Sequence, residues 1–205
     1  MKNLKLSLEY EVEVRDKNGQ LLDHKKGESH TWVKNFIQVL KAYFSAGSEI
    51  ITDTSGASRT VKGYVWAGAT GDFYFLSANA PANNDAYGIQ VGGSDAPFSR
   101  TQYALGSKIS HGTGSGQLVY GASTVESVVD EDTASSFRIT RVFTNNSGAS
   151  VVVREIGIAI YYRVVDGSTA VSVYFLAVRD LLPSPSSIPD GATMTVRYKV
   201  RVSYA

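Results

Sequence analysis

The chain contains no cysteine, only 5 prolines in 205 residues and no long apolar run. Without cysteine there are no disulfides, no thiolate metal ligands and no cysteine nucleophile. The longest apolar stretch, from Ile156 to Tyr162, is far too short to span a bilayer, so no membrane partner is expected. A surplus of one charge sign is also lacking, since 20 Lys and Arg residues balance 19 Asp and Glu. Nucleic-acid binders gather excess cations on one face, and we therefore expect no specific nucleic acid.

We expect no secretion signal either. The first ten residues alternate charged and apolar side chains, whereas a signal peptide needs an unbroken apolar segment. We therefore expect a protein that is made in the cytoplasm without a signal peptide and reaches its site by lysis or by assembly inside the cell.

Strict alternation of apolar and polar side chains marks the first and last segments of the chain. Residues 4–14 and 194–204 each place apolar side chains on one face and polar ones on the other, which predicts half-buried antiparallel strands. Asp16 to Gly19 follow the first strand, and Asn18-Gly19 predicts a type I′ hairpin turn. The outward side chains are acidic on the first strand and basic on the last: Glu9, Glu11, Glu13, Arg197, Lys199 and Arg201. If both strands are sheet edges, they are candidates for contacts between subunits.

One segment, about residues 30–46, breaks the β pattern. Bulky apolar side chains recur there at spacings of three and four, which predicts an amphipathic helix packed on the sheet. These residues are Trp32, Val33, Phe36, Ile37, Val39, Leu40, Tyr43 and Phe44. Ser29 or Thr31 is the expected N-cap, and Gly47 the expected left-handed residue after the helix. We interpret the stripe as core packing rather than the lining of a cofactor site.

Short strands separated by tight turns fill most of the remaining chain. We expect them at residues 20–26, 60–67, 73–76, 88–93, 117–129, 136–144, 150–165 and 171–178. Strands at this spacing indicate an antiparallel β-sandwich or jelly roll. No repeat or linker divides the chain, and we therefore predict one mainly β domain spanning residues 1–205.

A Gly/Ser-rich segment at residues 94–116, called the excursion below, is too long for a plain connection in a compact domain. Loops of this size are usually functional, or they become ordered only against a partner. We predict that it contacts other copies of the chain. The candidate contact residues in it are Ser94, Pro97, Phe98, Arg100, Tyr103, Lys108 and His111.

Catalytic and metal-binding patterns are not found. The histidines His24, His30 and His111 lack the spacing that brings two ligands to one metal, and no strained-turn nucleophile motif occurs. Residues 112–116 are glycine-rich but lack the Lys and the helix of a phosphate-binding loop. The acidic run at residues 130–132 has no spaced ligand series for Ca²⁺, and we interpret it as a solvated hairpin tip. We predict no enzyme activity, cofactor, metal or small-molecule substrate.

Two further features leave alternatives open. Tyr64, Trp66 and Tyr74 form the best aromatic cluster for stacking on a sugar, although aromatic residues in strands more often belong to the core. Arg154-Glu155 and Arg179-Asp180 are neighbours in strands, so one charge of each pair falls on a packed face. Such a charge must find a partner there or across a subunit interface.

Three stretches together carry a resemblance: residues 88–121, 141–160 and 176–196. They include Gly88-Ile-Gln-Val-Gly-Gly, Arg154-Glu-Ile-Gly-Ile-Ala-Ile and Ile188-Pro-Asp-Gly-Ala-Thr-Met-Thr-Val. Their order resembles the small β-sandwich virion proteins of tailed bacteriophages and other prokaryotic viruses. The resemblance implies a non-enzymatic structural protein of the virion, from the head decoration, neck, tail or fibre, whose partners are copies of itself and other virion proteins. The alternative from another class is a carbohydrate- or receptor-binding module on the same sandwich.

Overall fold

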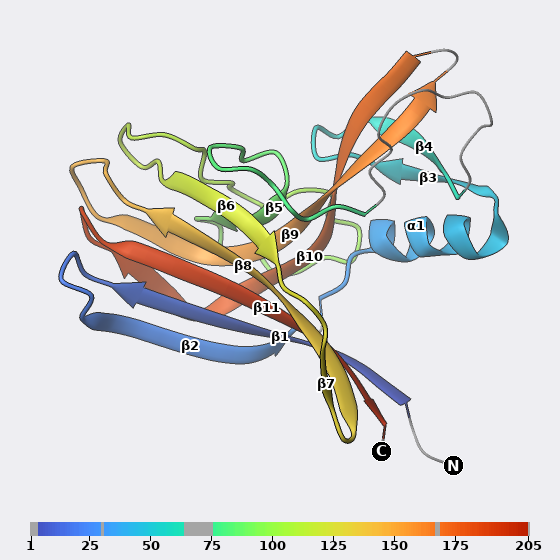
Figure 1. Cartoon of the computed structure of the whole chain (residues 1–205). Coiled ribbons are helices and arrows are strands. Elements are labelled where there is room, and N and C mark those ends of the chain that lie inside the picture. The colour runs from blue at the N-terminus through green and yellow to red at the C-terminus, as the bar shows by residue number, and fades with distance from the viewer. Residues whose placement is uncertain (1–3, 30, 64–75, 167–168, 205) are drawn as a thin grey trace.

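The structure is a computed structural model of the chain and describes residues 4–29, 31–63, 76–166 and 169–204. Two antiparallel sheets face each other, with one helix at one end (Figure 1). The larger sheet has the order β2-β1-β11-β8-β6 with β7 beside β8, and the smaller has the order β10-β9-β5. The predicted mainly β fold, an antiparallel sandwich with one helix, is confirmed.

The elements have the following bounds. The larger sheet comprises β1 (Leu4–Arg15), β2 (Leu21–Ser29), β6 (Val119–Val125), β7 (Val129–Glu131), β8 (Ala134–Thr144) and β11 (Thr193–Tyr204). The smaller sheet comprises β5 (Gly88–Gly92), β9 (Val151–Asp166) and β10 (Thr169–Ile188). A separate hairpin consists of β3 (Ser48–Thr52) and β4 (Ser58–Lys62), and the helix is α1 (Lys34–Ser45).

The core lies between the two sheets. Inward side chains of β1 and β11, such as Val12 and Val196, meet those of β9 and β10, such as Ile156 and Phe175, and all four are buried. Burying an aliphatic or aromatic side chain of this size contributes about 1.5–3 kcal/mol. The alternation seen in the sequence therefore decides which face of each strand stabilises the fold.

The terminal strands are interior strands. β1 lies between β2 and β11, and β11 lies between β1 and β8. Each therefore has both backbone edges paired, and the prediction that they are free edges for contacts between subunits is wrong. The physical reason is their mutual register, which pairs residues 4–15 with residues 204–193 in one continuous antiparallel ladder.

The first hairpin turn also differs from its prediction. Gly19 has a positive φ of 82°, but Asn18 does not, so the turn is not type I′. The Asp16 carboxylate accepts hydrogen bonds from the backbone N–H groups of Asn18 and Gln20 at 2.9 and 2.8 Å. This side chain therefore sets the turn geometry, a common role of Asp in turns.

Helix α1 begins and ends differently from the expected caps. Val33 occupies the N-cap position without a side-chain hydrogen bond, so neither Ser29 nor Thr31 caps the helix. At the other end Ala46, rather than Gly47, takes the left-handed conformation, with φ of 47°. The backbone N–H of Gly47 then donates to the carbonyl of Ala42 and closes the last turn.

The helix packs on the β3–β4 hairpin and on β10 at one end of the sandwich (Figure 1). Val39 and Ala42 are buried, while Ile37 and Phe44 are 60% and 90% exposed. The prediction that the whole apolar stripe is core is therefore wrong for these last two. Lys41 lies between them on the outer side of the helix and is itself exposed.

The middle of the chain follows the prediction only in part. The buried strand expected at residues 88–93 is confirmed as β5. The strand expected at 60–67 overlaps β4 only in its first residues, and most of 60–67 and 73–76 lies outside the described residues. In the part of the chain that is described, no helix is long and apolar enough to cross a membrane.

Candidate functional site

The excursion covers the outer face of the smaller sheet. Leu105 packs there with Val33, which precedes the helix, and with Leu176 of β10, and all three are buried. The smaller sheet is therefore covered on both faces, which explains the unbroken buried runs at residues 155–160 and 175–180. It also explains why two adjacent charged residues of β10 can both be buried.

A buried ion pair fastens the excursion to this sheet. Nε of Arg179 donates to Oε2 of Glu155 at 2.5 Å, and both side chains are fully buried. Glu155 also accepts hydrogen bonds, at 2.8–3.3 Å, from three backbone amides, those of Ser94, Gly106 and Ser107. Arg179 donates at 2.9 Å to the carbonyl of Ala96 and at 3.1 Å to the side-chain oxygen of Gln102.

This pair answers the question raised by the adjacent charges of the sequence. The partner of Arg179 is Glu155 in the same chain, not a residue across a subunit interface. A buried ion pair is tolerated only where further hydrogen bonds satisfy both groups, and here the excursion supplies them. The excursion is therefore held by its own chain and does not need a partner to become ordered.

Three of the predicted contact residues in the excursion make internal contacts. Phe98 is half-buried against the cluster of Val33, Leu105 and Leu176. Ser94 and His111 are held through their backbone: the amide of Ser94 donates to the Glu155 carboxylate, and the amide of His111 donates to the Asp85 carboxylate. These contacts fix the shape of the excursion.

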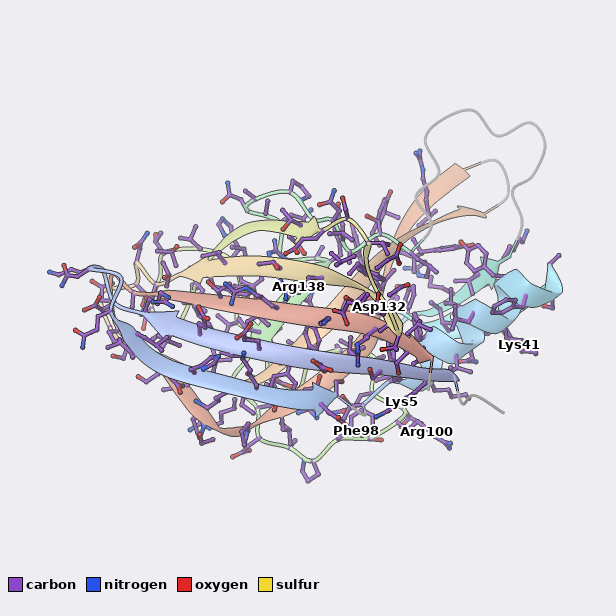
Figure 2. The ribbon with its side chains drawn as sticks, turned by 60° about the horizontal axis from the view of Figure 1, so that its bottom comes forward. Lys5, Lys41, Phe98, Arg100, Asp132 and Arg138 are labelled. Atoms are coloured by element: carbon purple, nitrogen blue, oxygen red, sulfur yellow. The ribbon has the colours of Figure 1, made fainter. Side chains whose placement is uncertain are left out.

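The other four candidates in the excursion are exposed, and one of them, Lys108, also makes an internal contact. Pro97, Arg100 and Lys108 are exposed, and Tyr103 is 43% exposed. Lys108 forms an ion pair with Asp85 at 3.1 Å. Figure 2 shows Phe98 and Arg100 on a loop beyond the β2 edge of the larger sheet, away from Arg138 on its front face. The structure therefore separates the predicted contact residues of the excursion from those of the last strand.

Arg141 of β8 is a second buried arginine, and the sequence did not single out its role. It is fully buried and donates at 2.9 Å to the carbonyls of Gly121, Tyr87 and Ile89, and to that of Asn84. Its guanidinium lies 4.7 Å from the centre of the Tyr120 ring. Burial lowers the pKa of Arg141 to about 10. This side chain joins the loop before β5 to the larger sheet.

Asp180, the neighbour of Arg179, faces the space between the two sheets. The hydroxyl of Tyr198 donates to Oδ2 of Asp180 at 2.9 Å, and the hydroxyl of Thr31 donates to Oδ1 at 2.6 Å. Burial, and then the negative charge of Asp180, raise the pKa of Tyr198 well above its usual range. Thr31 therefore joins the helix lead-in to the core.

The outward charges of β1 and β11 meet within one chain. Arg197 lies 3.6 Å from Glu11 and 3.5 Å from Glu13. Lys199 and Arg201 lie 3.5 and 3.4 Å from Glu131 at the end of β7. The predicted contact residues Arg197, Lys199 and Arg201 thus share one surface, the outer face of the larger sheet.

Glu11 is the most strongly perturbed carboxylate of this face. A hydrogen bond from Lys26, together with weaker contributions from His24 and Arg197, lowers the pKa of Glu11 to about 2. Glu11 itself therefore keeps its negative charge to acidic pH.

A shallow depression of ≈ 390 Å³ lies in the middle of this outer face. It is lined by Glu9, Tyr10, Glu11, Lys26, Gly27, Glu28, Arg138, Arg197 and Lys199. Charges of both signs reach it from four neighbouring strands. Arg138 projects from β8 on this side of the molecule (Figure 2).

The face also brings together one trio of metal-ligand type, Glu11, Glu13 and His24. Sequence spacing did not predict it, because the cross-strand pairing of Glu13 with His24 depends on the register of β1 and β2. Lys26 and Arg197 already neutralise the two carboxylates, at 2.9–3.6 Å. We therefore assign no metal to this trio.

The acidic run at residues 130–132 is exposed, as predicted for a hairpin tip. The predicted glycan-contact residues Tyr64, Trp66 and Tyr74 all lie outside the described residues.

A different aromatic cluster is found on the smaller sheet. The rings of Tyr87, Tyr161 and Tyr174 lie 5.3–5.8 Å apart, and each ring is half-buried. Tyr161 and Tyr174 face each other across β9 and β10. The sequence could not reveal this cluster, because Tyr87 is far from the other two along the chain and the pairing of Tyr161 with Tyr174 depends on the register of β9 and β10.

Comparisons with known proteins add no relative. No protein-family model, no curated protein and no solved structure matches this chain.

Proposed function

We propose that this protein is a non-enzymatic structural component of a prokaryotic virus particle, in which it is present as repeated copies. The proposal rests on the resemblance of residues 88–121, 141–160 and 176–196 to small β-sandwich virion proteins, and on one observation of the fold. That observation is the excursion, which is irregular in backbone yet fastened by the buried pair of Arg179 and Glu155.

The ion pair supports the proposal for an energetic reason. Burying two charges costs several kcal/mol of desolvation per ion, which their attraction and hydrogen bonds must offset. A short loop would not need a buried ion pair to hold its backbone in place. Here it fixes the outward side chains Pro97, Arg100 and Tyr103 on a rigid base, and rigid surfaces bind partners with a smaller loss of conformational entropy.

The test is mass spectrometry of purified virus particles from a host whose virus encodes the chain. Peptides of this protein should occur in the particle at many copies per genome and remain after density-gradient purification. If the protein is abundant in the lysate but is lost from the particles during purification, the proposal is wrong.

A second candidate function is carbohydrate or receptor binding, which the cluster of Tyr87, Tyr161 and Tyr174 favours. Adjacent half-buried tyrosines offer aromatic surface with polar rims, the combination that stacks on a sugar ring. Glycan-array binding that is lost in Tyr174→Ala, and kept in the exposed control Tyr103→Ala, would support it. Equal binding by both variants would exclude this cluster as the binding site.

A further inference from the structure

The outer face of the larger sheet carries an unusual order of charges. In one row across four neighbouring strands, Glu28 of β2 lies opposite Glu9 of β1, and Glu9 lies opposite Lys199 of β11. Lys199 in turn lies opposite Arg138 of β8. We call these four residues the charge row; its order is two anions followed by two cations.

The charge row is unfavourable within a single chain. Cross-strand partners share a face, and like charges directly opposite each other destabilise a sheet. The row contains two such contacts, Glu28 with Glu9 and Lys199 with Arg138. An alternating order of the same four residues would avoid both.

The only favourable neighbours in the row do not form an ion pair. Lys199 lies opposite Glu9 in the ladder, but its ammonium group is instead 3.5 Å from Glu131 on the other side. Among the described residues, Glu9 and Arg138 have no ion-pair partner. The row therefore has one uncompensated anion, Glu9, on its acidic side and one uncompensated cation, Arg138, on its basic side.

The same order is self-complementary. Consider a two-fold axis that runs along the outer face, parallel to the strands and midway between β1 and β11. Rotation by 180° about this axis generates a second copy whose outer face is turned toward the first, with its charge row in the reverse order. Arg138 of the second copy then lies over Glu28, and Lys199 of the second copy lies over Glu9. Adjacent strands are spaced by about 4.8 Å, so the row spans roughly 14 Å and forms four such contacts, two of each kind.

The adjacent row agrees with this arrangement. Glu11 lies opposite Arg197 in the ladder, and the two residues are equally far from the same axis. The rotation therefore places Glu11 of one copy over Arg197 of the other copy. The charge row also borders the ≈ 390 Å³ depression, into which long side chains of a second copy can extend.

We infer that the outer face of the larger sheet binds a second copy of this chain in a two-fold dimer through the charge row. This inference rests on the proposed function, since it names the partner and the surface of one contact between repeated copies. Two-fold interfaces use the same patch on both subunits, and a self-complementary charge order is what such a patch requires.

The test exchanges charges and mixes variants. Glu9→Lys with Glu28→Lys makes all four charges of the row positive, and Arg138→Glu with Lys199→Glu makes all four negative. Each double variant alone should self-associate at least about tenfold more weakly than the natural chain at low ionic strength, by sedimentation equilibrium. An equimolar mixture of the two should form a heterodimer, because one row is then positive and the other negative.

Two controls separate this effect from unfolding and from net charge. Circular dichroism and thermal unfolding establish that each variant is folded, and a variant with all four changes, whose row order is reversed, should dimerise again. Asp95→Lys with Asp132→Lys and Lys17→Glu with Lys34→Glu change the net charge equally at exposed positions outside the row. Both should associate like the natural chain.

The inference is overturned if the natural chain is monomeric at high concentration and low salt, or if both double variants dimerise normally. It is also overturned if their mixture associates no better than either alone. None of these results depends on particle composition, so a protein found in virions without this dimer would refute the inference and leave the proposed function standing.

Discussion

Arg179 and Glu155 form an ion pair in which both side chains are fully buried and Nε lies 2.5 Å from Oε2. The pair joins two neighbouring strands of the smaller sheet, and its remaining hydrogen bonds go to the excursion. One interaction therefore stabilises the sheet and also sets the position of a long loop.

Replacing Arg179 by Met should reduce the free energy of unfolding by about 3–5 kcal/mol, because Glu155 is then left buried and unpaired. Tryptic cleavage after Arg100 should also become severalfold faster as the excursion loses its anchor. Urea denaturation and timed proteolysis measure the two effects. Arg154→Met is the matched control, since Arg154 lies beside Glu155 on β9 and is half-buried; its change should stay within about 0.5 kcal/mol. Equal effects of the two substitutions would contradict the anchoring role.

Replacing Arg141 by Met should reduce stability by at least about 3 kcal/mol, because several buried carbonyls then lose their donor. Arg141→Lys should recover only part of this loss, since an ammonium group has fewer donors than the guanidinium and cannot reach carbonyls in several directions. Urea denaturation of both variants, with the exposed Arg100→Met as a control, checks the order. If the Lys variant were as stable as the natural chain, the positive charge of Arg141, and not its several hydrogen-bond donors, would account for its contribution to stability.

Replacing Tyr198 by Phe should cost about 1–3 kcal/mol, because the buried carboxylate of Asp180 loses a hydrogen-bond donor. Tyr10 faces Tyr198 across the β1–β11 ladder, and among the described residues its hydroxyl has no hydrogen-bond partner, so Tyr10→Phe is the matched control. Thermal unfolding should show a clear decrease for Tyr198→Phe and little change for Tyr10→Phe. Similar effects of the two would mean that ring packing, and not the bond to Asp180, is what matters.

Stability should decrease in acid, partly through Glu11. The native pKa of Glu11 is about 2, below its ordinary value of 4.5, so its contribution is present above pH 4.5 and is lost as the pH falls toward 2. Glu11→Gln should therefore be less stable near neutral pH and should approach the natural chain as the pH falls between about 4.5 and about 2. Urea denaturation across this range, with Asp95→Asn as an exposed control, tests it. A constant difference between the two chains at every pH would refute the linkage.

Local patterns in the sequence were sufficient for most strands outside the middle of the chain and for the existence of the helix, but not for β3. The alternation in residues 4–14 and 194–204 fixes which face is buried, and this part of the prediction agrees with β1 and β11. The same pattern cannot say which strand lies next to which. For that reason the pattern leaves both terminal strands as candidate edges, whereas in the structure each forms a full ladder with the other.

The site residues depend even more on tertiary structure. Arg179 and Asp180 are both buried because the excursion adds a third layer, a fact that no strand pattern contains. The charge row follows from the register between four strands, so Glu28 and Arg138 gave no signal in the sequence. Ile37 and Phe44 fit a helical core stripe but remain exposed, because the helix packs at the end of the sandwich rather than across a sheet.

The absence of cysteine makes a direct measurement of the contact between copies possible, because one introduced cysteine carries one spin label. Thr195 and Val142 are cross-strand neighbours on the outer face. Thr195 is on β11, beside the inferred axis, and Val142 is on β8, one strand farther from the axis. Thr113 lies in the excursion. In the dimer at low salt, electron paramagnetic resonance should detect a short distance between copies from Thr195→Cys, a longer one from Val142→Cys and no proximity from Thr113→Cys. A dimer with close labels at Thr113 and none at Thr195 would contradict the account.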